Sequence, residues 1–166
     1  MKINNVNIEI NNAYCEDGVN LVRVNGNVNS INVNNAKSDA IDIDFSKLLL
    51  NKITVKNAGN DCVDFSFGDY QINSSFLENC KEKAISVGEK SKLIINSVSI
   101  KNSITGIASK DSSEVFISDV NIEDTLICFT AYNKKQEFWG GKLTVKDHNC
   151  QSNQIVQEIG SLVEFI

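Results

Sequence analysis

The sequence contains no proline, a single histidine, a single tryptophan and few aromatic residues overall. Together with its many asparagines, this composition is unusual for a β-sandwich or a helical bundle. Long hydrophobic runs are also missing, so we expect no transmembrane segment, and the start MKINNVNIEI lacks the apolar core of a signal peptide. We therefore expect either a cytoplasmic protein or part of a longer envelope or secreted chain whose targeting segment lies elsewhere.

Other scarcities exclude several kinds of site. The formal net charge of −5 disfavours nonspecific binding to nucleic acid and to anionic bilayers. His148 lies in a polar stretch and does not complete a Ser/His/Asp or Cys/His catalytic set. The nine glycines are dispersed and form no phosphate-binding loop. The threonines form no regular array of the kind an ice-binding face requires.

What the chain does have is a repeat of about 22 residues. The blocks SDAIDIDFS, NDCVDFSFGD and EKAISVGE superimpose when Ala40, Cys62 and Ala84 are aligned. Gly18 lies one step before these three residues, and Gly106 and Cys128 lie one and two steps after them. A period of this length with alternating rather than helical apolar spacing is typical of a β-solenoid.

Each repeat contains three short apolar runs separated by polar bends. Runs such as Ile31/Val33 and Ile41/Ile43 alternate with polar residues, so their apolar side chains are expected to point inward. The bend between them carries an asparagine or aspartate in coil after coil: Asn12, Asn35, Asn57, Asn79, Asn102 and Asp124. Stacked asparagines can hydrogen-bond one another along such a column.

These patterns predict an all-β fold, a single right-handed parallel β-helix of six to seven coils with three short strands in each. We expect one domain over residues 1–166, with an irregular final coil at 146–166. The apolar ending LVEFI and the lack of a capping helix suggest a short member or a fragment of a longer β-helix. Uncapped ends of this kind are also expected to favour self-association.

The five cysteines are odd in number and show no C-x-x-C spacing, so neither a zinc site nor a disulfide framework is expected. Cys62 and Cys128 occupy one column three coils apart, which separates them by roughly 14 Å at about 4.8 Å per coil. A disulfide cannot cover that distance. We therefore predict reduced, structural thiols.

The acidic residues of the repeat form the main candidate site. By parity, Ala40, Asp42 and Asp44 are expected to face away from the core, as are Cys62 and Asp64 in the next coil. Stacking then places four carboxylates on two adjacent coils: Asp39, Asp42, Asp61 and Asp64. Neighbouring carboxylates repel by roughly 1 kcal/mol even in water. Oxygen-rich clusters of this kind suit Ca²⁺.

Up to about Val145 the chain resembles the pectate-lyase-like superfamily of right-handed β-helices. Its central blocks are similar to those of polygalacturonase-type glycosidases, which carry N-T-D-G-x-D, G-D-D-C-(I/V) and G-H-G-(I/L)-S-(I/V)-G on successive coils. The resemblance places Asp39 on the first catalytic aspartate and Asp61 on the second member of the aspartate pair. Asn60 replaces the proton-donating aspartate and Lys83 replaces the histidine. Since an amide cannot donate that proton, the resemblance implies fold and glycan ancestry more than this hydrolysis.

Some polysaccharide lyases with this fold combine calcium with a lysine base. That analogy makes Asp39, Asp42, Asp61 and Asp64 ligands of Ca²⁺, and makes Asp39, Asp61 and Lys83 the catalytic residues. Lys83 would remove the proton beside a uronate carboxylate of an acidic polysaccharide. Nearby carboxylates raise the pKa of a lysine, so this lyase or epimerase chemistry requires the metal to cancel their field.

Candidate substrate contacts surround the acidic column. They are Asp44, Ser86, Lys110 and Lys134. Lys110, Lys134 and Lys135 would form a basic strip for an anionic glycan, or else be solvated turn charges. Phe138 and Trp139 would stack on a sugar, or else cover the coil locally.

Three alternatives to the lyase remain open from the sequence. The first is a non-catalytic rod that presents glycan-binding or partner-binding turns on a surface or envelope protein. The second is a polygalacturonase-like hydrolase. In the third, the aspartates are solvated outer residues, and Lys83 ends the column in a salt bridge worth about 0–1 kcal/mol if exposed.

Overall fold

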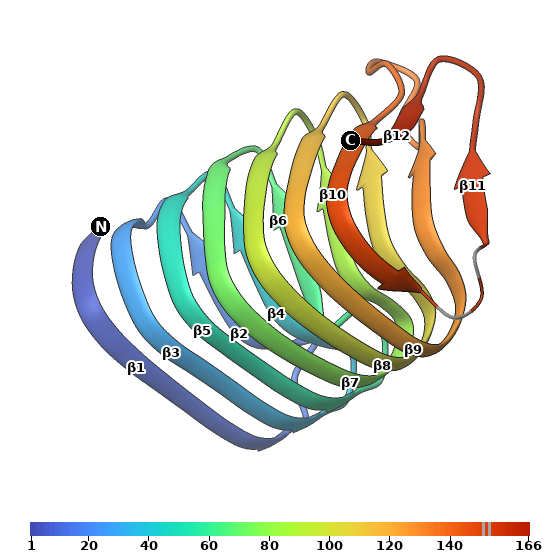
Figure 1. Ribbon diagram of the computed structural model, residues 1–166. Helices are drawn as coiled ribbons and strands as arrows, with labels where there is room; N and C mark the ends of the chain where they lie inside the picture. The colour runs from blue at the N-terminus through green and yellow to red at the C-terminus, as the bar shows by residue number, and fades with distance from the viewer. Residues whose placement is uncertain (151, 153) are drawn as a thin grey trace.

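The computed structural model describes residues 1–150, 152 and 154–166 and shows a rod of stacked coils (Figure 1). The strands in chain order are β1 (Lys2–Ala13), β2 (Asp17–Val22), β3 (Asn25–Ala36), β4 (Asp39–Asp44), β5 (Lys47–Ala58), β6 (Val63–Ser66), β7 (Asp69–Gly88), β8 (Lys92–Lys110), β9 (Glu114–Tyr132), β10 (Lys142–Cys150), β11 (Ile155–Gln157) and β12 (Leu162–Phe165). The described residues contain no helix, and therefore none long and apolar enough to cross a membrane.

The coils pair in parallel at the interval that the repeat predicts. Ile31 lies opposite Ile53, and Asp42 lies opposite Asp64, each pair being 22 residues apart. The sheet order β1-β3-β5-β7-β8-β9-β10-β12 follows the axis of the rod. The predicted fold is thus confirmed: a right-handed parallel β-helix of about seven turns.

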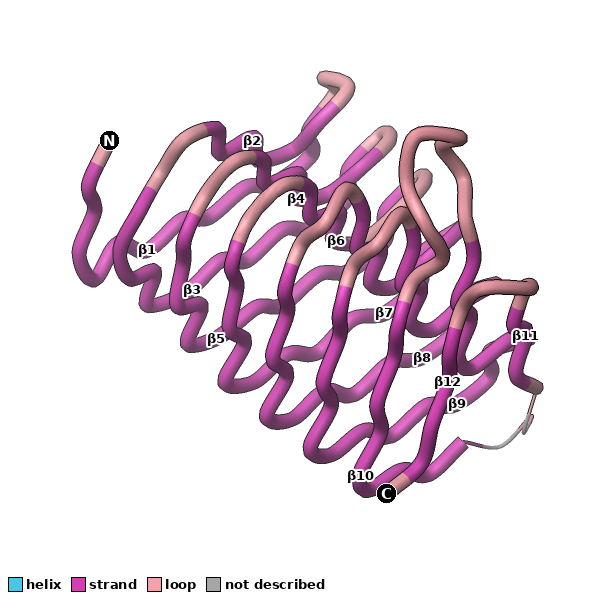
Figure 2. The backbone as a smooth tube through the Cα atoms, turned by 90° about the horizontal axis from the view of Figure 1, so that it is seen from above, coloured by secondary structure: helices cyan, strands magenta, loops and turns pink. Residues whose placement is uncertain are grey.

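The three predicted apolar runs are not separate strands: two of them share one bent strand in the first coils, and β7, β8 and β9 each contain all three. In β5, Leu48–Leu50 and Ile53/Val55 belong to the same strand, which bends at Asn51. The Asn51 amide oxygen accepts a hydrogen bond of 2.8 Å from the Nδ2 of Asn73 in the next coil. Figure 2 shows these bends repeating along the rod.

The asparagine ladder at the other bend is confirmed. Nδ2 of Asn35 donates to Oδ1 of Asn12 at 3.0 Å, and Asn57 donates to Asn35 in the same way at 2.8 Å. Asn79 and Asn102 continue the ladder with bonds of 2.8 and 2.7 Å. All of these asparagines have a φ near +60°, a conformation that asparagine tolerates better than most residues. Both the side-chain hydrogen bonds and the positive φ therefore favour asparagine at this bend.

The core is a column of aliphatic and aromatic side chains inside the coils. Ile41, Ile43 and Phe65 are fully buried, as predicted. The prediction that Ala40 and Cys62 face outward is wrong, because both are fully buried. Ala40 and the next residue, Ile41, are both fully buried at the start of β4, so strict alternation begins only at Ile41.

The final coil follows the same pairing. β11 pairs with β9, and β12 pairs with β10, both in parallel. This part of the rod exposes apolar side chains at Ile159, Phe165 and Ile166. Self-association through the ends of the rod stays a prediction.

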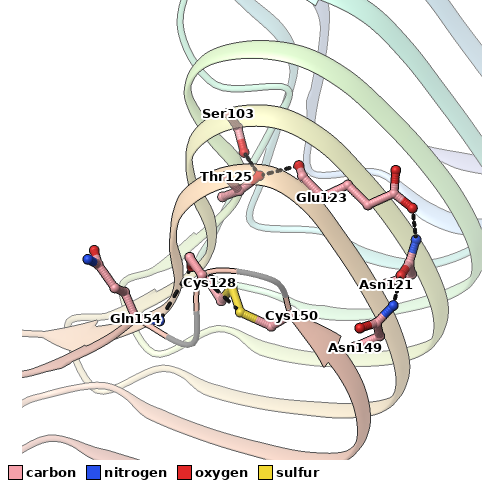
Figure 3. Close-up of a disulfide and its surroundings, with 9 residues drawn as sticks. Ser103, Asn121, Glu123, Thr125, Cys128, Asn149, Cys150 and Gln154 are labelled. Atoms are coloured by element: carbon pink, nitrogen blue, oxygen red, sulfur yellow. Dashed lines mark hydrogen bonds between the residues drawn. A yellow bond between two sulfur atoms is a disulfide. The ribbon is translucent and has the colours of Figure 1, made fainter.

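The cysteines require a correction, because the structure contains two disulfides, Cys62–Cys80 and Cys128–Cys150, the second of which is drawn in Figure 3. Cys62 and Cys128 do not bond each other, as expected, but each bonds a cysteine of a different column in the next coil. The Cα atoms of Cys62 and Cys80 lie 5.3 Å apart, within the range that a disulfide spans. Cys15 is free and exposed. The prediction of reduced thiols failed because it compared cysteines within one column only.

We expect the Cys62→Ala/Cys80→Ala variant to lose about 3 kcal/mol of unfolding free energy, because the bond closes a loop of 18 residues. Urea unfolding without reductant measures this loss. The matched control, Cys15→Ala, should stay within about 0.5 kcal/mol of the parent since Cys15 is exposed. A count of free thiols in the denatured, unreduced parent should give one, and a count of five would contradict the disulfides.

Candidate functional site

The predicted acidic residues come together on the outer surface of β4 and β6. We call this surface the acidic face and define it by the following residues: Asp39, Asp42, Asp44, Asp61, Asp64, Lys83 and Lys110. The register pairs Asp17 with Asp39 and Asp42 with Asp64. Stacking of the acids on adjacent coils, on which the sequence interpretation depended, is therefore present.

Asp39 and Asp61 bind the backbone of the next coil. The Asp61 N–H donates to Oδ1 of Asp39 at 2.9 Å, and the Lys83 N–H donates to Oδ1 of Asp61 at 2.8 Å. Nδ2 of Asn60 donates to the same Asp39 oxygen at 2.7 Å. Two of the predicted catalytic residues thus join successive coils, and Asn60 supports one of them.

Asp42 and Asp44 lie on the acidic face with no cationic partner among the described residues. Asp42 accepts only a hydrogen bond of 3.2 Å from Asn20, whose Nδ2 also donates to Asp17. Burial, followed by repulsion from Asp44, Asp17, Asp64 and Asp39, raises the pKa of Asp42 to about 7. Burial and the charge of Glu89 raise the pKa of Asp44 as well. Asp42 is therefore partly protonated at neutral pH.

Asp64 differs from Asp42 because a lysine reaches it. Nζ of Lys110 lies 3.7 Å from Oδ1 of Asp64, and the Lys110 side chain is only 5% exposed. The lysine stem crosses Gly88, where a Cβ would stand 2.7 Å from the Lys110 Cε. Burial raises the pKa of Asp64, and Lys110 acts against that shift. The buried Ser86 Oγ has no hydrogen-bond partner among the described residues.

Lys83 ends the acid column as a cation. Its Nζ lies 3.5 Å from Oδ1 of Asp61 and also contacts Glu82. Burial alone would lower the pKa of Lys83, but the hydrogen bond that Lys83 donates to Glu82 and the charge of Asp61 outweigh burial and raise it. Burial raises the pKa of Asp61 to about 6 despite Lys83. A base must be neutral, so Lys83 is in the wrong protonation state for that role without a further cation.

Tyr132 belongs to this surface, although the sequence interpretation did not identify it. It lies opposite Lys110 in the register, one coil further on. Burial raises the pKa of its phenol, and the charges of Lys110 and Lys83 act against that shift, so the phenol lies near both lysines. The signal was present in the spacing, since Tyr132 follows Lys110 by one repeat.

The predicted basic strip is not continuous. Lys110 points to Asp64, and Lys135 pairs with Glu89 at 2.5 Å. Lys134 is exposed, and its backbone N–H donates to Oδ1 of Asp111 at 2.7 Å. Of the four predicted substrate contacts, Asp44, Ser86 and Lys110 thus lie on or beside the acidic face, and Lys134 lies on the following turn.

Aromatic rings line the turn beside the acidic face. Phe45 and Phe67 stack with ring centres 4.6 Å apart, and Phe138 packs edge-on against Phe67. Phe45 and Phe67 remain 46% and 41% exposed and line a groove together with Glu89 and other turn residues. Phe138 covers its neighbours, whereas Trp139 is 83% exposed. We call Phe45, Phe67 and Phe138 the aromatic row.

No group of three or more histidine, cysteine, aspartate or glutamate side chains in the described part of the chain is arranged to hold a metal ion. Comparisons with protein-family models, with curated proteins and with solved structures found no match. The geometry therefore establishes a parallel β-helix, and the pectate-lyase-like and polygalacturonase-like relationships stay predictions.

We expect the unfolding free energy to fall as the pH rises from about 4 to about 7. A carboxyl whose pKa is raised in the folded state binds more protons there than in the unfolded chain, so raising the pH through this window favours unfolding. Asp42→Asn should reduce this fall and stabilise the protein more at pH 8 than at pH 4. Urea unfolding at both pH values measures the effect. Asp69→Asn, at the exposed first residue of β7, is the control, and an equal pH response of both variants would contradict the assignment.

Proposed function

We propose that the acidic face binds a polysaccharide and that Asp42 and Asp64 act on it as an acid–base pair. The observation that carries this proposal is a pair of partly buried carboxylates, Asp42 and Asp44, that have no cationic partner among the described residues and lie beside Asp64 and exposed aromatic rings. Strongly raised carboxyl pKa values are more frequent at functional sites than elsewhere.

A sugar chain fits the chemistry of this surface. Sugar hydroxyls donate hydrogen bonds, which partly buried carboxylates need, and they bring no further negative charge. The apolar faces and edges of sugar rings suit the aromatic row and the exposed Trp139. Because the face extends over successive coils, an extended polymer can occupy more of it than a single sugar can.

Asp42 and Asp64 have the different environments that acid–base catalysis requires. Asp42, with a pKa of about 7, can donate a proton to a leaving glycosidic oxygen. Lys110 favours the ionised form of Asp64, which can attack the anomeric carbon or activate a water molecule. Paired strands place the backbones of the two residues about 4.8 Å apart, so both carboxyl groups can reach the same glycosidic bond, as retaining glycosidases require.

The calcium-assisted version of the proposal uses the same surface. Asp42, Asp44 and Asp64 are not arranged as a metal site in this structure. The calcium-assisted version therefore requires these carboxylates to move together around the cation, which would relieve their repulsion. The cation would also lower the pKa of Lys83, which elimination or epimerisation needs. Common ancestry with polysaccharide lyases and polygalacturonases is part of this proposal.

The two disulfides favour a site of action outside the reducing cytoplasm, because such bonds form and persist in oxidising compartments. A surface or envelope location agrees with a polysaccharide ligand. It agrees equally with the non-catalytic rod, in which the same face binds the polymer and leaves it intact.

Measurements of polysaccharide binding and cleavage by the Asp42→Asn variant distinguish the hydrolytic enzyme from the non-catalytic rod. Across a panel of neutral and acidic polysaccharides, we expect binding within a few-fold of the parent but reducing-end release lowered roughly 10²–10⁴-fold, since the proton donor is lost. Asp119→Asn is the matched control, because Asp119 is exposed on β9 and lines neither the acidic face nor the groove of the aromatic row. Binding without turnover in the parent would support the rod, and no binding to any polymer in the panel would refute the proposal.

A calorimetric Ca²⁺ titration tests the metal-assisted version. We expect weak binding, with a Kd on the order of 10⁻⁴–10⁻³ M, and a higher melting temperature at pH 7.5 in Ca²⁺ than in chelator. Asp42→Asn/Asp64→Asn should abolish both effects. A flat titration, with no unsaturated product formed from acidic polysaccharides, would remove calcium-assisted elimination and leave the hydrolytic version standing.

A further inference from the structure

A second elongated concavity follows the asparagine ladder, away from the acidic face. It has a volume of about 710 Å³ and extends over the five coils from Asn12 to Asn102. The ladder amides line it together with small residues such as Ala36 and Ala58. We call this concavity the asparagine groove.

The groove carries charge of the opposite sign to the acidic face. Lys37 and Lys81 line it and are exposed, and neither forms an ion pair within the described residues. Lys37 directly follows Ala36 and Lys81 directly follows Cys80, and both of these residues pair with Ala58 of the coil between them. The two lysines therefore lie two coils apart, about 10 Å along the axis. Gly59 lies between them, where a Cβ would stand 1.9 Å from the Lys37 carbonyl oxygen. Gly59 therefore adds no side chain between the two lysines in the register.

The rest of the lining is that of a site for an extended, hydroxylated ligand. Each ladder amide uses one N–H on its neighbour and has a second N–H for another acceptor. Tyr14, at the N-terminal end of the groove, is 81% exposed, and Ile104 at the other end is 51% exposed. The exposed ring of Tyr14 can stack on a sugar.

We propose that the asparagine groove binds an anionic polysaccharide along the rod axis, with the amides on its hydroxyls and Lys37 and Lys81 on acidic groups of alternate sugars. The amides offer the ligand one polar contact in every coil. The two lysines offer it one positive charge in every second coil. Two lysines on a chain with a net charge of −5 are too few to hold a nucleic acid, whose phosphates carry much denser charge. This site is independent of the proposed function, which uses the acidic face.

The test compares two pairs of charge reversals. Lys37→Glu/Lys81→Glu changes the groove, and Lys56→Glu/Lys101→Glu is the matched control. Lys56 and Lys101 are exposed, lie outside both proposed sites and are also two registered coils apart, with Glu78 between them. The probes are hyaluronan, in which every second sugar is acidic, and polygalacturonate, with neutral dextran as the uncharged reference. Affinity is measured by calorimetry at low and at physiological salt.

We expect the groove variant to weaken hyaluronan binding at least tenfold at low salt and the control pair to change it less than twofold. The parent should lose affinity for hyaluronan as salt rises and should bind dextran weakly or not at all. Equal losses in the two variants, no loss in either, or equal binding of dextran and hyaluronan by the parent would overturn the proposal.

A failure here is distinguishable from a failure of the proposed function. The groove variant should leave any polysaccharide cleavage and its dependence on Asp42 unchanged, because the groove and the acidic face have no residue in common. Unchanged thermal unfolding of both variants ensures that a loss of affinity reports the groove and not the fold.

Discussion

Backbone pairing at a fixed interval of 22 residues decides what every side chain of this protein meets. In a parallel β-helix each residue lies over its counterpart in the next coil, so like groups are forced together. An asparagine has both a donor and an acceptor, and a column of asparagines therefore satisfies itself, as the ladder from Asn12 to Asn102 does. An ionised aspartate has acceptors only, and a column of aspartates needs donors from elsewhere.

The protein meets that need in two different ways. Asp39 and Asp61 receive backbone N–H groups from the next coil and thereby join the coils. Asp64 receives the charge of Lys110, which reaches it across Gly88. Asp42 receives little more than the amide of Asn20, and its pKa rises to about 7. The functional proposal follows from this difference: of these carboxyls, Asp42 is the one left most in need of a proton, a hydroxyl or a cation.

Most of the fold could be predicted from the sequence, because period, alternation and bend asparagines are local patterns. The position of Ala40 and Cys62 could not, since two consecutive residues are buried there and strict alternation begins only with the next residue. The Cys62–Cys80 bond was missed because cysteines were compared within one column, whereas this bond joins different columns of successive coils. At the site, stacking of the acids was predictable, but the contacts of Lys110 and Tyr132 depend on side-chain paths across neighbouring coils.

The most direct test of this account is a carboxyl-carbon NMR titration of Asp42. The account predicts a midpoint near pH 7 in the parent protein and a lower midpoint in Asp64→Asn, because one repelling charge has been removed from the next coil. A midpoint near 4 in the parent, unchanged by Asp64→Asn, would show that coil stacking does not crowd these carboxylates and would contradict the account.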